Sequence, residues 1–165
     1  MKRRVAVGFV FLLLVIPARV FAKGDISKIT IQGPDLKIPI AITDPKTLPH
    51  FTVWNGPGIS GPGLKKANKF IIDWSQRVNE RPQELQRYQV SFYAEWPTER
   101  LIYVVFYEYN PATERGYIYL PGRTDEWYRL NVSTIFRGVE GRWFRASSEW
   151  DNFARPLILD AKAQG

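Results

Sequence analysis

The clearest structural signal in the sequence is Arg87-Tyr-Gln-Val-Ser-Phe-Tyr-Ala-Glu-Trp96, then Pro97-Thr-Glu-Arg100, then Leu101-Ile-Tyr-Val-Val-Phe-Tyr-Glu-Tyr109. Both long runs are dominated by β-branched and aromatic residues, which are enriched in β-strands, and the proline between them favours a turn. A third run of this kind, Gly116-Tyr-Ile-Tyr-Leu120, follows a loop that contains Pro111. The sequence therefore predicts a three-stranded antiparallel meander over residues 87–120.

A four-residue loop at 97–100 would set the register of the first two strands. Side chains alternate between the two faces of a strand, so the register divides them into two sets. One set is almost entirely apolar and is expected to form the core. Its predicted pairs are Trp96 with Leu101, Ala94 with Tyr103, Phe92 with Val105, Val90 with Tyr107, and Tyr88 with Tyr109. In the third strand, Ile118 and Leu120 would join this core face.

The opposite face mixes aromatic rings with polar side chains. Its predicted pairs are Glu95 with Ile102, Tyr93 with Val104, Ser91 with Phe106, Gln89 with Glu108, Tyr119 with Phe106, and Tyr117 with Glu108. Aromatic rings stack on the C–H faces of sugars while carboxylates and amides bond to hydroxyl groups, and tyrosine equally suits protein partners. The predicted binding residues are therefore Tyr93, Phe106, Glu108, Tyr117, Tyr119 and Gln89. Alternatively, the C-terminal helix or a second sheet covers this face and the rings belong to the core.

Alternating or β-branched runs on both sides of the meander predict more strands. These runs are 26–32, 38–42, 70–74, 127–136 and 142–146. A short helix is expected over 149–155, after Ser148 and before Pro156, and the glycines and prolines of 54–66 predict a surface loop. The fold class that follows is mainly β: a single antiparallel β-sandwich or barrel-like domain of about eight strands with one short C-terminal helix.

Residues 1–22 are typical of a secretory signal peptide. Three bases precede an apolar run over 5–16, which is too short to span a membrane, and Val20-Phe-Ala22 resembles a cleavage site. Cleavage would leave one β-rich domain at 23–165, without a transmembrane span, in the periplasm or outside the cell. It would also remove four bases and no acid, so the net charge falls from +7 to +3. With so small an excess of positive charge, nucleic acid is not an expected partner.

The composition excludes several kinds of chemistry. The chain has no cysteine and one histidine, His50, which excludes a thiolate nucleophile, a disulfide scaffold and a multi-histidine metal site. No metal and no cofactor is expected. Glycoside hydrolysis needs only two acids at a set separation, and the candidates are Asp73, Glu95, Glu99 and Glu108. Of these, Glu108 is the best placed because tyrosines flank it.

Four short segments are spread over most of the chain: Ile29-Thr-Ile-Gln-Gly-Pro34, Pro39-Ile-Ala-Ile-Thr-Asp-Pro45, Gly116-Tyr-Ile-Tyr-Leu-Pro-Gly122 and Gly141-Arg-Trp-Phe-Arg-Ala146. Together they resemble a loose family of uncharacterised exported bacterial proteins. The resemblance implies bacterial export and one β-rich domain. It implies no activity and no site residues.

The leading hypothesis is an exported binding or structural protein of the bacterial envelope or exterior, which meets a glycan or another envelope protein through an aromatic sheet face. The alternative is a small carbohydrate-directed hydrolase that uses a carboxylate pair including Glu108. In addition, Arg142-Trp-Phe-Arg145 alternates bases with aromatic residues. This pattern suits binding of an anion or an acidic polysaccharide, and it equally suits a strand with two solvated arginines.

Overall fold

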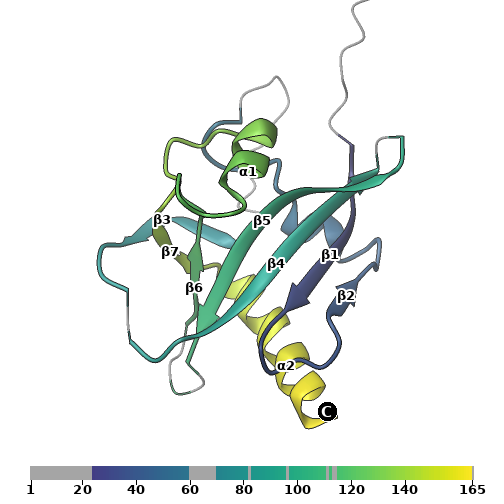
Figure 1. The fold of residues 1–165 in the computed structure, drawn as a ribbon. Helices are drawn as coiled ribbons and strands as arrows, with labels where there is room; N and C mark the ends of the chain where they lie inside the picture. The colour runs from purple at the N-terminus through teal and green to yellow at the C-terminus, as the bar shows by residue number, and fades with distance from the viewer. Residues whose placement is uncertain are drawn as a thin grey trace, which may run out of the picture.

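The computed structural model describes residues 24–59, 70–81, 83–95, 97–110, 112 and 115–164. Its elements are β1 (Ile26–Gln32), β2 (Ile40–Ile42), η1 (Leu48–Phe51), β3 (Ile72–Val78), β4 (Gln86–Glu95), β5 (Glu99–Tyr109), β6 (Tyr117–Tyr119), α1 (Tyr128–Thr134), β7 (Trp143–Ala146) and α2 (Ser148–Ala163). Within these residues, seven strands form one antiparallel sheet in the order β2-β1-β4-β5-β6-β7-β3. The prediction of a mainly β antiparallel fold with a C-terminal helix is confirmed (Figure 1).

The predicted meander corresponds to β4, β5 and β6, and its faces are as expected except at the hairpin end, although its first register is not. Phe92 pairs with Tyr103 rather than with Val105, a shift of two positions. The turn is tighter than expected, because Glu95 already pairs with Glu99, which shifts the register by three positions. Ile102 then forms a bulge, and this extra residue reduces the shift to two positions. From Phe92 and Tyr103 onward the shift is even and leaves the side chains on their predicted faces. At the hairpin end the shift is odd, so Leu101, expected on the core face, pairs with Tyr93, while Ile102, expected on the outer face, is buried in the core. Trp96, which was expected opposite Leu101, lies outside the described residues.

The second register of the meander is confirmed. Phe106 pairs with Tyr119 and Glu108 pairs with Tyr117. Ile118 and Leu120 are fully buried on the core face, as predicted.

The strand predicted over 127–136 is wrong, since this segment contains α1. Strand β6 ends at Tyr119, which pairs with Phe106 of β5. The backbone of Val104 therefore has no strand partner on the β6 side. The side chain of Asn131 in α1 replaces it, accepting from the Val104 amide at 2.8 Å and donating to its carbonyl at 2.6 Å. This long-range bonding requirement outweighs the β-propensity of the segment.

The C-terminal helix extends beyond the predicted range of 149–155. Pro156 does not end it: proline removes the bond to the carbonyl of Asn152 and crowds that carbonyl, and burial of helix residues on both sides of Pro156 outweighs this cost. Trp150, Ala154 and Ile158, spaced four residues apart, are fully buried against the sheet. The N-cap is Ser147 rather than Ser148, and its hydroxyl accepts from the Trp150 amide at 3.2 Å.

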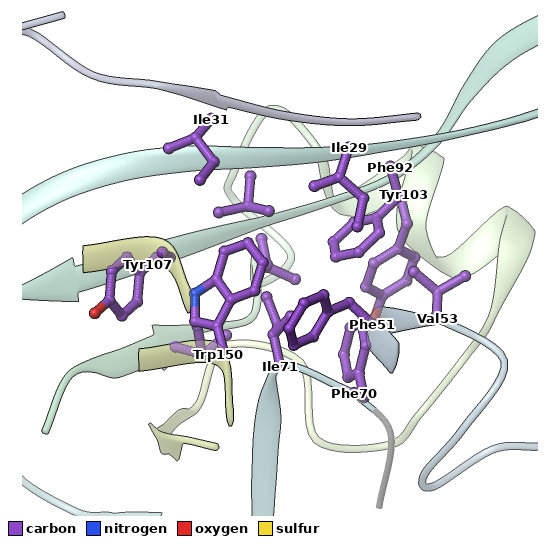
Figure 2. Packing of buried hydrophobic residues seen from close by; sticks show 14 of the residues in the cluster. Ile29, Ile31, Phe51, Val53, Phe70, Ile71, Phe92, Tyr103, Tyr107 and Trp150 are labelled. Atoms are coloured by element: carbon purple, nitrogen blue, oxygen red, sulfur yellow. The ribbon is translucent and has the colours of Figure 1, made fainter. Parts of the chain in front are cut away.

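The core lies between one face of the sheet and a layer that contains α2, η1 and the segment around Ile71. Trp150 sits between Tyr107 and Phe51 (Figure 2), with ring centroids 6.1 Å and 5.1 Å away. We call this side of the sheet the inner face and the opposite side the outer face. Helices α1 and α2 lie on opposite faces (Figure 1), so α1 is the helix that covers part of the outer face.

The signal peptide at 1–22 lies outside the described residues, as does the 60–66 part of the loop at 54–66. No helix among the described residues is long and apolar enough to cross a membrane.

Candidate functional site

The sheet register arranges the side chains of the outer face in rows that run across the strands. Directly paired residues of antiparallel strands share a face, and residues two apart on one strand do so too. The first row, which we call the charged row, consists of Arg87, Glu108, Tyr117, Arg145 and Asp73, from β4, β5, β6, β7 and β3. The neighbouring row, the aromatic row, consists of Gln89, Phe106, Tyr119, Trp143 and Val78 from the same strands.

Glu108 is the centre of the charged row and is fully buried. Its carboxylate accepts from Nε of Arg87 at 2.5 Å and from Nε of Arg81 at 2.8 Å. The indole N–H of Trp143 also donates to it, at 3.2 Å. The two arginine side chains remain 39% and 44% exposed. What this part of the face presents to water is therefore guanidinium groups, with the carboxylate beneath them.

The rings of the aromatic row stand beside one another. The centroids of Tyr119 and Trp143 are 4.1 Å apart with an interplanar angle of 29°, and Phe106 continues the stack at 6.4 Å from Tyr119. The guanidinium of Arg87 lies over the rings of Phe106 and Tyr119, at 4.9 Å and 5.6 Å from their centroids. Because the ring of Tyr119 lies between the other two rings and beneath a cation, its broad faces are not open for a sugar to stack on.

Tyr119 is tied into the structure at its hydroxyl end as well. The hydroxyl donates to Asp125 at 2.8 Å, and Asp125 also accepts from the Gly122 amide at 2.6 Å. Burial raises the pKa of Tyr119 to about 12, and the bond to the Asp125 carboxylate adds to the increase. Tyr119 is thus a fixed, neutral element of the face at physiological pH.

Two other predicted aromatics also carry a cation on the ring. The guanidinium of Arg145 lies 4.3 Å from the ring centroid of Tyr117, and Tyr117 is 5% exposed. The ammonium of Lys28 lies 4.3 Å from the centroid of Tyr93. Lys28 in turn pairs with Glu99, and that hydrogen bond, with a second from Ser27, lowers the pKa of Glu99.

The structure brings five of the six predicted binding residues together. Gln89, Phe106, Glu108, Tyr117 and Tyr119 lie in the two adjacent rows. Tyr93 does not join them: it is four residues from Gln89 along β4, or about 13 Å. Glu108 and Tyr117 are also buried, so the expectation that both present polar groups to solvent is wrong, because the arginines lie over them.

Helix α1 covers the part of the outer face between Tyr93 and the two rows. Under it, Ser91 and Val104 are buried, and Trp127 donates its indole N–H to Gln89 at 3.2 Å. A helix therefore covers this part of the face, but it is not the one that the alternative named. The helix concerned is not the C-terminal one, which packs on the inner face.

Sequence reasoning missed Arg81 and Arg87. Arg87 lies two residues before Gln89 on the same predicted strand, so the alternation of side chains would also have placed it on the outer face. Arg81 lies in the connection between β3 and β4, and it contacts Glu108, which is 27 residues away in the sequence. No local pattern signals such a contact.

The other candidate residues lie away from the two rows. His50 is exposed on η1 and lines a shallow hollow with Lys46 and Glu149, on the α2 side of the molecule. Among the described residues there is no group of three or more histidine, aspartate and glutamate side chains that could hold a metal ion. Comparison of the chain with protein-family models, with curated proteins and with solved structures found no match.

Proposed function

We propose that this chain is an exported protein of the bacterial envelope or exterior that binds a glycan through the outer face of its sheet, without catalysing a reaction. The observation that carries the proposal is the pair of rows, in which guanidinium groups rest on stacked rings across five strands. The signal-like segment at 1–22 and the resemblance to exported bacterial proteins support the localisation.

Rigid side chains favour binding because little conformational entropy is lost when a ligand arrives. The guanidinium of Arg87 donates from Nε to the carboxylate of Glu108 and lies over the rings of Phe106 and Tyr119. Arg145 is held by the ring of Tyr117 and by a bond to the carbonyl of Arg115 at 3.4 Å. These donors and the amide of Gln89 can bond to hydroxyl and acidic groups of a sugar chain lying across the strands.

A glycan fits this face better than a protein partner does. Protein interfaces usually have an apolar centre surrounded by a polar rim. The large hydrophobic side chains that the described residues expose are Ile38, Phe136 and Leu159, and none of them belongs to the two rows. A surface made of guanidinium groups and ring edges matches the many oxygen atoms of a polysaccharide.

The hydrolase alternative is less well supported. The oxygens of Glu108 already accept three N–H bonds. The acid in the same row, Asp73, is three strands away, about 14 Å, whereas glycosidase carboxylates lie about 5 to 9.5 Å apart. Glu95 and Glu99 do pair at the hairpin end, but both are exposed, and the lowered pKa of Glu99 is opposite to what a general acid needs.

The proposal is tested with the purified 23–165 form on a panel of immobilised cell-wall and extracellular polysaccharides. We expect one or more glycans to be retained, Trp143→Ala to weaken retention about tenfold or more, and Leu159→Ala on α2 to have no effect. Loss of binding in both variants, or in neither, contradicts the proposed surface.

The same panel separates binding from hydrolysis. Glu108→Gln should reduce retention only moderately, and no shortened glycan should form over hours. Release of products by the wild-type chain that Glu108→Gln abolishes would instead establish the hydrolase.

A further inference from the structure

Arg81 and Arg87 form a pair of cations around one buried carboxylate. Each uses only its Nε atom to bind Glu108. Within the part of the chain that the structure describes, the terminal nitrogens of both groups make no hydrogen bond. One arginine would be enough to neutralise Glu108, so the second leaves an excess positive charge with free donors at the surface.

We propose that Arg81 and Arg87 form a subsite for an anionic substituent, a carboxylate or a sulfate, of the glycan. The inference rests on the proposed function and specifies its ligand as an acidic polysaccharide. Guanidinium groups bind oxyanions through paired N–H donors with the geometry of a fork. Here two such forks diverge from the two oxygens of one carboxylate, which fixes their separation.

The buried carboxylate orients the arginines. Glu108 itself is fully buried and is anchored by the indole of Trp143. It binds the Nε side of each guanidinium, so the terminal nitrogens are the ones left for solvent. The rings of Phe106 and Tyr119 fix the plane of Arg87. An anion therefore meets donors that are already placed, which is the condition for a selective site.

The same face carries further arginines at a distance that suits a polymer. Arg145 lies three strands from Arg87 in the charged row, about 14 Å away. Next to it, Arg115 pairs with Asp73 at 3.3 Å. Four arginines thus accompany two carboxylates across the sheet. A chain with acidic groups at intervals can contact both positive ends, which a single small anion cannot.

The experiment measures affinity for matched charged and neutral polymers. The probes are polygalacturonate, the same polymer after reduction of its carboxyl groups to alcohols, dextran sulfate, and unmodified dextran. We expect at least one polyanion to bind roughly tenfold or more tightly than its neutral counterpart, with an affinity that falls as salt is raised. The two pairs of polymers distinguish carboxylate from sulfate recognition.

Arg81→Gln removes one cation and leaves Glu108 paired with Arg87. We expect it to weaken polyanion binding about tenfold and to leave binding of neutral polymers unchanged. Lys37→Gln, an equal change of charge at an exposed position outside the two rows, should have less than about a twofold effect. Arg81→Lys keeps the charge without the fork and should fall between Arg81→Gln and wild type. Thermal unfolding of each variant shows that it is folded.

Three results would overturn the inference: equal affinity of the wild-type chain for charged and neutral polymers, equal losses for Arg81→Gln and Lys37→Gln, or tighter binding of single-stranded DNA than of either polyanion. If charged and neutral polymers bind equally well, the proposed function still holds provided that Trp143→Ala abolishes the binding of a neutral glycan. If no polymer and no glycan of the panel binds, the inference and the proposed function both fail.

Discussion

At the scale of single residues, the outer face is organised by Glu108. Most carboxylates on a sheet surface point into water, but this one is fully buried and accepts from Arg81, Arg87 and Trp143. A buried charge is tolerated only with good hydrogen-bonding partners, so the three donors are what allow it to stay. Through these bonds, one residue fixes two cations and a ring.

Glu108→Gln should therefore destabilise the fold. The change leaves two guanidinium groups without a counter-charge, although both are partly exposed and can be solvated. We expect the free energy of unfolding to fall by about 1–3 kcal/mol. The measurement is urea denaturation beside Glu126→Gln, an exposed control expected to stay within about 0.5 kcal/mol of wild type. Equal effects of the two changes would show that Glu108 is not a structural centre.

Ionisation of Tyr119 should make the free energy of unfolding depend on pH in the alkaline range. Burial raises the pKa of its hydroxyl from the ordinary 10.0 to about 12. Between these values the phenol ionises in the unfolded chain but not in the folded one. The free energy of unfolding should thus be unaffected by this group below pH 10 and should fall as pH rises toward 12.

Tyr119→Phe removes this contribution and should make the alkaline decline in stability shallower. Some decline remains in the variant, because burial also raises the pKa values of Tyr88, Tyr103 and Tyr107. Denaturant unfolding at several pH values from below 10 to 12 measures it. Identical slopes for wild type and Tyr119→Phe would mean that the ring is more exposed than the structure shows.

At the scale of elements, side chains on loops and helices complete bonds that the short strands leave open. Arg137, between α1 and β7, donates to the carbonyls of Val53, Asn55 and Pro57 at 2.7–3.0 Å and to the hydroxyl of Tyr103. It is 5% exposed. The loop that begins at residue 52 is thereby tied to the sheet.

The Gly-Pro-Gly sequence of this loop has a backbone reason. Gly56 and Gly58 have φ values of +94° and +78°, in the left-handed region that favours glycine. A Cβ atom at Gly58 would also lie 2.1 Å from the carbonyl oxygen of Phe136. The described part of the loop thus packs closely against the segment that carries Arg137.

Arg137→Met should detach this loop. The change leaves three carbonyls and a buried hydroxyl without their donor or partner, and we expect a loss of about 3–5 kcal/mol in the free energy of unfolding. Arg142→Met, at an exposed position in the same connection, should change it by less than about 0.5 kcal/mol. Amide hydrogen exchange at residues 53–56 and 58 should rise in Arg137→Met alone. Unchanged exchange there would show that other contacts hold the loop.

Helix α2 is attached to the sheet by a buried carboxylate. Asp151 accepts from the Tyr107 hydroxyl at 2.6 Å and from the Gly116 amide at 2.9 Å. Asp151→Asn weakens both bonds, and we expect a loss of about 1–3 kcal/mol in chemical denaturation. The exposed Asp160 of the same helix provides the matched Asp160→Asn control, expected near zero. A comparable loss in the control would argue against a specific role of the buried carboxylate.

At the scale of the whole molecule, local patterns predict the strands well and long-range contacts poorly. Strand alternation placed Phe106 beside Tyr119 and Glu108 beside Tyr117, because period-two patterns and short connections determine both. It could not place Arg81 on Glu108, nor show that Asn131 would turn a β-prone segment into a helix. Those outcomes depend on where β6 ends and on which buried groups then need partners.

Binding of a glycan to the two rows on the outer face can be followed by NMR of the tryptophan indole N–H groups. The indole of Trp143 bonds to Glu108 within these rows, whereas Trp150 is fully buried on the inner face. We predict that titration with the glycan that binds best shifts the Trp143 signal and leaves the Trp150 signal in place. A shift at Trp150 with Trp143 unmoved would contradict the account.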